Sequence, residues 1–327
     1  MKLRLRTSIY ISIFYLLVLG SSIFLSLTKN QESSIDNYRT LIFVITSILI
    51  IIIGIIAMNE IMHIVGLSWK RKIYWAYQTL FIAIAFTNSF LDYFYVFNHP
   101  HRTSEMVLSV LYSVEGLIYI IFWMLAIFLW RKHQISYAVT IIASLLGVGI
   151  ISMLYIFFNE KLDWTYTVFV LMIPVLTDVF AFFIGCKYGK NKILPSISPK
   201  KTWEGSIGGL IVTVVTVAVF YLIREIFAGN GENSNIYSEF WGISGISYHN
   251  SAGVNHLLLG LLVVIVLTTV LSIISQIGDF VFSWIKRLHS KKDFANYLPG
   301  HGGICDRIDS LTFVAIAASV FIGLLGM

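Results

Sequence analysis

The chain has 327 residues, of which 57% are hydrophobic and only 12% are charged, and its mean hydropathy is +0.81. A soluble domain usually carries about 25% charged residues, so this composition excludes an ordinary water-soluble fold and predicts that lipid covers most of the surface. The net charge is +6. The two cysteines, Cys186 and Cys305, exclude a disulfide framework and match no zinc-ligand spacing.

Apolar segments long enough to cross a bilayer recur along the whole chain. A transmembrane helix needs about 20 predominantly apolar residues. Nine segments meet this requirement: 8–27, 41–58, 74–97, 106–130, 136–157, 165–186, 206–227, 256–282 and 310–327. No obvious internal repeat or low-complexity linker separates them. We therefore predict an all-α integral membrane protein with about nine transmembrane helices in a single polytopic domain, residues 1–327.

The basic residues predict the orientation of these helices, because Lys and Arg accumulate in cytoplasmic loops. With a cytoplasmic N-terminus, all 23 Lys and Arg residues fall on the cytoplasmic side except Lys29, Arg39, Arg102, Lys161 and Arg224. We therefore expect the N-terminus in the cytoplasm and the C-terminus on the outer side. Two long basic loops, 187–205 and 283–309, then face the cytoplasm together.

The stretch 276–310 is much more polar than orientation requires. Its charged residues include four acids and five bases. The acids are Asp279, Asp293, Asp306 and Asp309, and the bases are Lys286, Arg287, Lys291, Lys292 and Arg307. Acids placed among bases in this way indicate a site that binds cations and phosphates together.

The spacing of the acids predicts a metal site. Asp279 lies at the end of an apolar helix with Ser283 one turn later, and Asp306 and Asp309 share a face at the start of the last span. A carboxylate at the membrane edge is costly unless it is paired, so it is functional by default. Hard oxygen ligands suit Mg²⁺, which usually takes one or two carboxylates plus substrate phosphates. We therefore expect Mg²⁺, or another hard divalent cation, near Asp279, Ser283, Asp306 and Asp309.

The sequence His301-Gly302-Gly303 predicts a turn in the same stretch. Glycines let the backbone approach a ligand closely, and successive amides form an anion-binding nest. A pair of glycines alone more often marks an ordinary turn. Because Asp306 and Arg307 follow directly, we interpret this turn as part of the site.

The loop 187–205 ends in Ser198-Pro-Lys-Lys-Thr202 just before an apolar run. Thr202 is placed to cap the following helix. Lys200 and Lys201 then stand at a helix N-terminus, where backbone amides attract phosphate. A loop that only sets the topology and carries an ordinary cap explains the same residues about equally well.

Asp178 is an acid inside the sixth predicted span, followed by Ala181 and Gly185 at small-residue spacing. We assign the small residues to helix packing. The acid is either a polar packing contact or part of the site, and we keep it as a site candidate.

These polar residues resemble the phosphatidate cytidylyltransferase family, also called CDP-diacylglycerol synthases. The family's signature runs Ser-x-apolar-Lys-Arg, four residues, Lys-Asp, a small residue, then Leu-Pro-x-His-Gly-Gly-apolar-x-Asp-Arg-apolar-Asp. The matching residues are Ser283, Ile285, Lys286, Arg287, Lys292, Asp293, Ala295, Leu298, Pro299, His301, Gly302, Gly303, Asp306, Arg307 and Asp309. The chain shows no departure within this stretch.

The segment 178–205 is also similar to the family, with departures at Val179-Phe180 and at Phe182, where small or hydroxyl residues and a tyrosine are usual. The resemblance is confined to roughly the C-terminal half. It therefore divides the chain into variable N-terminal helices, 1–157, and catalytic helices, 165–327.

The resemblance implies that CTP and phosphatidate react to give CDP-diacylglycerol and pyrophosphate, with a divalent metal as cofactor. The candidate catalytic residues are Asp279, Lys292, Asp293, Asp306 and Arg307. The candidate substrate-binding residues are Asp178, Ser198, Lys200, Lys201, Thr202, Lys286, Arg287, His301, Gly302 and Gly303. We expect a multi-pass protein of the cell's inner membrane with a cytoplasmic site, partnered by CTP, phosphatidate and the bilayer. The resemblance also implies a homodimer, and nothing indicates a nucleic-acid partner.

Other functions remain open from the residues alone. A CTP-dependent polyprenol or phytol kinase would need a general base, for which Asp293 is suitable, and a transferase acting on archaeal-type ether lipids would use similar groups. A secondary transporter is the main alternative from another class, but its site would lie near the midplane and often repeat between halves. A scaffold without catalysis leaves the clustered acids unexplained.

Overall fold

The computed structural model describes residues 2–28, 36–64, 137–158, 164–228, 253–295, 297–298 and 302–325, together with Trp75, Gln78, Thr79 and Ile82. The predicted spans 74–97 and 106–130, and most of the predicted outer loop 228–255, lie outside the described residues. His301 also lies outside them.

Long helices account for most of the described chain. They are α1 (Lys2–Leu27), α2 (Asp36–Ile64), α5 (Tyr137–Phe158), α6 (Trp164–Tyr188), α7 (Trp203–Ala228), α9 (Gly253–Leu288) and α10 (Cys305–Leu325). Each overlaps a predicted span, but α1 begins six residues before its predicted span, and α2 begins five residues earlier and ends six residues later than predicted. Four described segments are long and apolar enough to cross a membrane: Tyr38–Ile64, Thr165–Tyr188, Trp203–Ile223 and Gly260–Leu288. The chain is therefore a mostly helical, multi-pass membrane protein.

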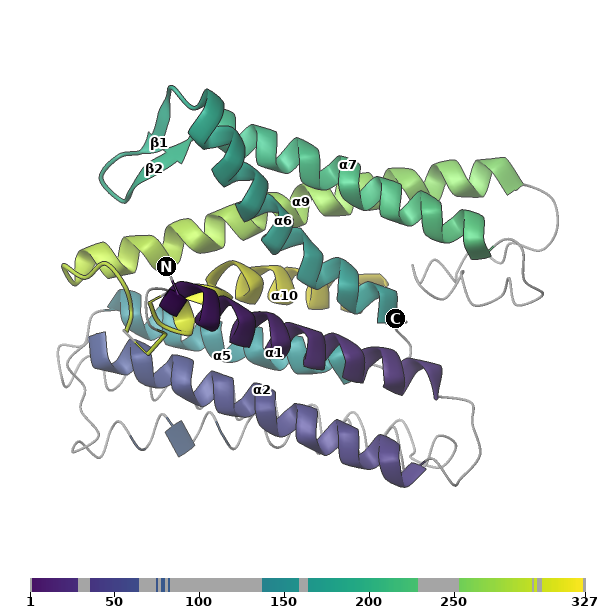
Figure 1. Cartoon of the computed structure of the whole chain (residues 1–327), viewed down its shortest axis with the longest axis horizontal. Coiled ribbons are helices and arrows are strands. Elements are labelled where there is room, and N and C mark those ends of the chain that lie inside the picture. The colour runs from purple at the N-terminus through teal and green to yellow at the C-terminus, as the bar shows by residue number, and fades with distance from the viewer. Residues whose placement is uncertain are drawn as a thin grey trace.

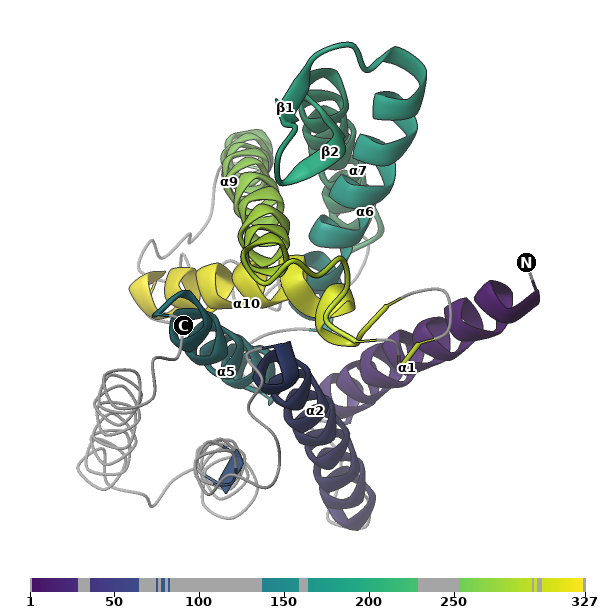
Figure 2. The same cartoon turned by 90° about the vertical axis from the view of Figure 1, so that its left-hand side faces the viewer.

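Helix α10 lies between two groups of helices. Seen end-on in Figure 2, α6, α7 and α9 lie on one side of it, and α1, α2 and α5 lie on the other. Two clusters of buried apolar side chains fill the contacts. One joins α1, α2 and α5 to the beginning of α10 and the end of α9, and the other joins α5, α6, α7 and α9 to the later part of α10. Because α10 belongs to both clusters, the position of its first turn depends on both groups.

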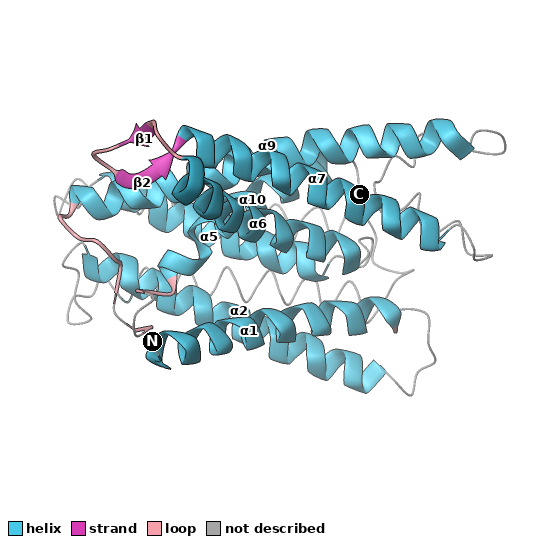
Figure 3. Ribbon diagram, turned by 45° about the horizontal axis from the view of Figure 1, so that its top comes forward, coloured by secondary structure: helices cyan, strands magenta, loops and turns pink. Residues whose placement is uncertain are grey.

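The segment predicted as the loop 187–205 contains a small β-hairpin, which corrects the all-α prediction. Strands β1 (Lys192–Leu194) and β2 (Ser198–Thr202) pair antiparallel, and Figure 3 shows them at one end of the bundle. The Trp203 amide donates to the Asn191 carbonyl at 2.9 Å and closes the base of the hairpin. A three-residue strand has too little alternation of apolar and polar residues to be predicted from a pattern.

The helices flanking the second predicted loop, 283–309, are longer than expected. Helix α9 continues to Leu288 and α10 begins at Cys305. Hydropathy ends a span where charged residues begin, but the charged residues at the end of α9 find partners, so the helix continues past the apolar run. In Figure 1 the hairpin and the end of α9 lie at the same end of the bundle.

Small residues let α6 and α7 approach closely, as predicted for Ala181 and Gly185. A Cβ atom on Gly209 would lie 2.7 Å from the Ala181 backbone nitrogen, and one on Gly205 would lie 2.9 Å from the Gly185 Cα atom. Close backbone approach of this kind is how helices associate in lipid, where the hydrophobic effect between helices is absent. The crossing places the hairpin beside the end of α9.

Candidate active site

The hairpin and α9 meet through Lys201 and Asp279. The Lys201 ammonium group forms an ion pair with the Asp279 carboxylate, and the two side chains are 26% and 22% exposed. The Ser283 hydroxyl donates to Asp279 Oδ1 at 3.2 Å, which confirms the predicted one-turn relationship between these two residues. The ammonium group also lies 4.7 Å from the centre of the Phe280 ring, within the range of a cation–π contact. The predicted site residues of the loop 187–205 and those of the polar stretch 276–310 are therefore adjacent.

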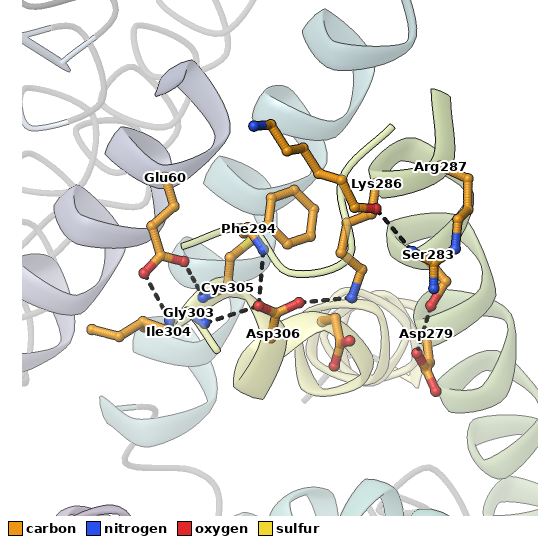
Figure 4. A network of polar contacts seen from close by, with 12 residues as sticks. Glu60, Asp279, Ser283, Lys286, Arg287, Phe294, Gly303, Ile304, Cys305 and Asp306 are labelled. Carbon is orange, nitrogen blue, oxygen red and sulfur yellow. Dashed lines mark hydrogen bonds and ion pairs between the residues drawn. The ribbon is translucent and has the colours of Figure 1, made fainter. Parts of the chain in front are cut away.

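Lys286 and Asp306 form a second, more buried ion pair. Lys286 Nζ lies 2.7 Å from Asp306 Oδ1, and the side chains are 10% and 5% exposed. The pair joins the end of α9 to the first turn of α10 (Figure 4). The Phe294 ring covers the lysine, with the ring centre 5.3 Å from Nζ. Charges this well shielded from water interact more strongly than exposed ones.

The second oxygen of Asp306 organises the connection between α9 and α10. Asp306 Oδ2 accepts hydrogen bonds from the amides of Phe294 at 3.0 Å and Gly303 at 2.9 Å. Gly302 adopts a φ of +83°, which favours glycine, and a Cβ atom there would lie 2.8 Å from Asp306 Oδ2. The predicted glycine turn is therefore folded around the Asp306 carboxylate, with Asp293 beside Gly302.

Arg287 attaches the hairpin to α9 at a second point. Its Nε donates to the Ile197 carbonyl at 3.1 Å, and its Nη1 donates to the Lys291 carbonyl at 2.8 Å. The side chain is otherwise exposed. The arginine thus holds the turn between β1 and β2 against the end of α9.

Asp178 brings a further helix, α6, to the same region, next to Asp309 of α10. The Ser310 hydroxyl donates to Asp178 Oδ2 at 3.3 Å, and the Ser310 amide donates to Asp309 Oδ1 at 2.8 Å. Asp309 lies near enough to Asp178 and Asp279 for their like charges to repel one another, and Asp178 lies near the opposite charge of Lys201. Carboxylates of α6, α9 and α10 therefore converge near the Lys201 ammonium group, and Asp178 belongs to the site region.

The remaining predicted residues have more varied surroundings. Thr202 is buried, and its hydroxyl accepts the Gly205 amide at 3.2 Å, so the predicted cap of α7 is confirmed. Lys200 is exposed, as are Arg307, Lys292 and Asp293. Ser198 begins β2 and is half-buried.

Glu60 is a site-region residue that the sequence did not indicate. It lies about one turn before the end of α2 and is fully buried. Its two carboxylate oxygens accept the amides of Ile304 and Cys305, each at 2.8 Å. A lone acid just beyond the predicted span 41–58 was the available signal, but nothing nearby in the sequence shows its partners.

A divalent cation such as Mg²⁺ requires a full shell of oxygen ligands. Within the described part of the chain, no three His, Cys, Asp or Glu side chains lie close enough to form a ligand set of their own. Mg²⁺ needs only one or two protein carboxylates when substrate phosphates complete its shell. Asp279 is partly exposed, carries a hydroxyl neighbour and already binds a cationic group. These residues fit a metal held jointly with a nucleotide.

The chain is similar to known proteins over most of its length. The chain matches the model of the cytidylyltransferase family over residues 34–325. It belongs to this family. The match begins in the N-terminal half, so family membership extends well beyond the C-terminal half that carries the motifs.

Three bacterial relatives of the chain share one name. Proteins called phosphatidate cytidylyltransferase are similar to the chain in Brucella abortus, with 35% identity over 164 residues, and in Bacillus subtilis, with 33% identity over 155 residues. These alignments cover 50% and 47% of this chain and 48% and 46% of the relatives, so the chain spans about half the length of either relative. A Staphylococcus epidermidis protein of that name is 32% identical over 217 residues, which cover 66% of this chain and 70% of the relative.

Proposed function

We propose that this protein transfers the cytidylyl group of CTP to phosphatidate, giving CDP-diacylglycerol and pyrophosphate. The observation that carries the proposal is the ion pair between Lys201 and Asp279, because it joins the two segments that resemble the family into one site. Family membership and the names of the relatives support the same reaction.

The reaction requires charge neutralisation more than proton transfer. A phosphate monoester is already mostly ionised at neutral pH, since its second pKa is about 6. An oxygen of the phosphatidate phosphate attacks the α-phosphorus of CTP and forms a new P–O bond. The bond from the α-phosphorus to the bridging oxygen breaks, and pyrophosphate leaves with the electron pair. The site must therefore hold two polyanions together.

The described side chains are suited to that task. Lys201 lies at the partly exposed face of the site and is available to exchange its carboxylate partner for a phosphate. Arg287 and the exposed Lys292 and Arg307 add positive charge at the same end of the bundle. Lys286 is mostly buried against Asp306, so we assign it chiefly to holding the Asp306 carboxylate in place.

A divalent metal would be held by Asp279, with Ser283 and Asp309 near it and the nucleotide phosphates completing the shell. Such an ion neutralises phosphate charge and stabilises the leaving pyrophosphate. Asp306 Oδ1 and Oδ2 are both engaged by donors from the chain, so its contribution to a metal site requires that one of these contacts opens.

We further propose the full topology: about nine transmembrane helices, a cytoplasmic N-terminus, an outer C-terminus and a site facing the cytoplasm of the inner membrane. This orientation gives the site access to cytosolic CTP and to lipid in the inner leaflet. The placement of the basic residues supports it. A homodimer is proposed from the family resemblance alone.

The test is transfer of label from α-³²P CTP to lipid by purified protein in detergent with phosphatidate and Mg²⁺. Parallel reactions contain a polyprenol with γ-³²P ATP or γ-³²P CTP. Label in CDP-diacylglycerol, and none in polyprenol phosphate, is the expected result. If folded protein labels only a different lipid, that lipid replaces phosphatidate as the proposed acceptor. If no lipid is labelled at all, the enzyme proposal is wrong and a transporter becomes the better hypothesis.

A further inference from the structure

The start of α10 is capped by a residue from a different helix. The first N–H groups of a helix have no partner within the helix itself, and a Ser, Thr, Asp or Asn at the preceding position usually supplies one. In this chain Ile304 occupies that position, and its side chain has no acceptor. Glu60 of α2 supplies the acceptors instead, with one carboxylate oxygen on the Ile304 amide and the other on the Cys305 amide (Figure 4).

The chain around Gly303 is shaped to admit this carboxylate. A Cβ atom at position 303 would collide with the Glu60 carboxylate. The Gly303 amide points to the other side and donates to Asp306 Oδ2 at 2.9 Å. Two carboxylates from different helices therefore hold the three consecutive amides of Gly303, Ile304 and Cys305.

This arrangement links α2 to the charged residues of the site. The three amides immediately precede Asp306, whose other oxygen binds Lys286 of α9 at 2.7 Å. Asp309 follows one turn later on α10. A rotation or shift of the first turn of α10 would therefore displace both aspartates relative to Asp279 on α9.

Glu60 is buried, so its hydrogen bonds to the start of α10 are not an incidental surface contact. The side chain is fully buried, and a buried carboxylate is costly unless hydrogen bonds compensate it. A carboxylate at a helix N-terminus is also favoured by the helix dipole. The hydrogen bonds that offset the cost of burying the Glu60 carboxylate exist only while the first residues of α10 lie beside it.

We propose that Glu60 is a positioning residue for the reaction, which fixes the first turn of α10 and thereby the placement of Asp306 and Asp309. The proposal rests on the cytidylyltransferase activity proposed above. It assigns to α2 a function in catalysis, although the motifs that resemble the family all lie in the C-terminal half.

The kinetic test compares Glu60→Gln and Glu60→Asp with the wild type in the CTP-to-lipid assay. Gln keeps the size of the side chain but presents one acceptor and one donor to two N–H groups, whereas Asp keeps both acceptors on a shorter stem. We expect Glu60→Gln to lower kcat by about 10–100-fold, the usual effect of losing a residue that orients reacting groups. The KM for CTP should change by less than about threefold, and Glu60→Asp should recover part of the lost kcat.

Ser47→Ala is the matched control on the same helix. Ser47 is buried in α2, and its hydroxyl has no hydrogen-bond partner among the described residues. The control should retain wild-type kcat. The same assay on the wild type tests the proposed function itself, so an inactive wild type would refute that function, whereas an active wild type with fully active Glu60 variants would refute only the positioning role.

A second measurement reports on the first turn of α10 without using activity. Cys305 is buried and Cys186 is exposed, and these are the 2 cysteines of the chain. In a Cys186→Ser background, maleimide labelling therefore follows Cys305 alone. Glu60→Gln should make Cys305 label faster, while the thermal midpoint in detergent stays near that of Ser47→Ala.

The outcomes separate a positioning role from general destabilisation. A drop in kcat with faster Cys305 labelling and a nearly unchanged thermal midpoint supports the proposal. A kcat within about twofold of wild type in folded Glu60→Gln overturns it. Activity that falls only in proportion to the fraction of unfolded protein overturns it as well.

Discussion

The Lys201 ammonium group lies against the Asp279 carboxylate, and this contact joins the β-hairpin to the polar end of α9. Both side chains remain about a quarter exposed, at 26% and 22%. The carboxylate is thus already occupied by a positive group at a place that an incoming anionic substrate can reach. Binding of nucleotide phosphates would draw the lysine to the phosphates and leave the carboxylate for a metal ion.

Asp279→Asn should nearly abolish cytidylyl transfer while leaving the fold intact. The substitution removes the negative charge but keeps an acceptor for the Ser283 hydroxyl. The partner ammonium group of Lys201 is itself partly exposed, so loss of the Asp279 charge does not leave an unpaired charge fully buried. We expect kcat/KM to fall by at least about 100-fold, with unchanged membrane insertion and an unchanged elution profile in detergent. Near-normal turnover by this variant would show that Asp279 binds no essential metal.

Lys201→Met should weaken substrate binding more than removal of another lysine from the same region. The matched control is Lys190→Met, which removes the same charge from an exposed position before β1. We expect the KM for CTP or for phosphatidate to rise by about tenfold or more for Lys201→Met, the effect of losing one charged hydrogen bond to phosphate. Steady-state kinetics with each substrate varied separately will show which phosphate the lysine contacts. Equal effects of the two variants would indicate a general charge effect.

Lys286→Met should destabilise the protein, in contrast to Lys201→Met. Lys286 and Asp306 are 10% and 5% exposed, and removal of the lysine leaves the Asp306 charge buried with only backbone amides beside it. Breaking such a pair typically costs about 3–5 kcal/mol. The thermal midpoint in detergent, followed by tryptophan fluorescence, should fall clearly below that of Lys291→Met, which removes an exposed lysine nearby. Similar midpoints for the two variants would contradict the buried pair.

Gly209→Ala should loosen the crossing of α6 and α7. The added Cβ would lie 2.7 Å from the Ala181 backbone nitrogen, and overpacking of this kind costs about 1–3 kcal/mol. Gly20→Ala is the control, because a Cβ at Gly20 meets nothing within 4 Å. The measurement is the thermal midpoint of each purified variant. A Gly209→Ala protein as stable as Gly20→Ala would mean that the two helices have room to separate.

Removal of divalent metal should abolish transfer reversibly. The proposed site supplies only part of a metal's coordination shell, so affinity for the ion should be low without nucleotide and higher with it. EDTA should stop transfer to phosphatidate, and Mg²⁺ in excess should restore it. Isothermal titration of Mg²⁺ with and without a non-hydrolysable CTP analogue checks the coupling. Transfer that continues in EDTA would exclude a metal-dependent reaction.

The sequence predicted the described helices and two local contacts of the site region, because hydropathy and motif spacing both act locally. Asp279 and Ser283 are one turn apart, and the cap formed by Thr202 depends on residues three positions apart. Such relationships follow from helix geometry alone. The family was predicted from the same short segments and is confirmed.

Relationships between distant segments were not predictable in the same way. The hairpin contains a three-residue strand, which is too short for a periodic signal. Glu60 and Cys305 are separated by 245 residues, and only the packed fold brings them together. The residues next to Glu60 in the sequence give no indication of partners 244 and 245 residues away.

The contact between α2 and α10 also has a consequence for biosynthesis. Glu60 is translated 244 and 245 residues before the two amides that it binds. During synthesis, α2 enters the membrane with an acidic group whose partners do not yet exist, and such a group is costly in lipid. Completion of the bundle removes that cost in one step. Ribosome-stalled chains that stop before residue 304 should therefore be recognised and degraded more readily than chains that extend through α10.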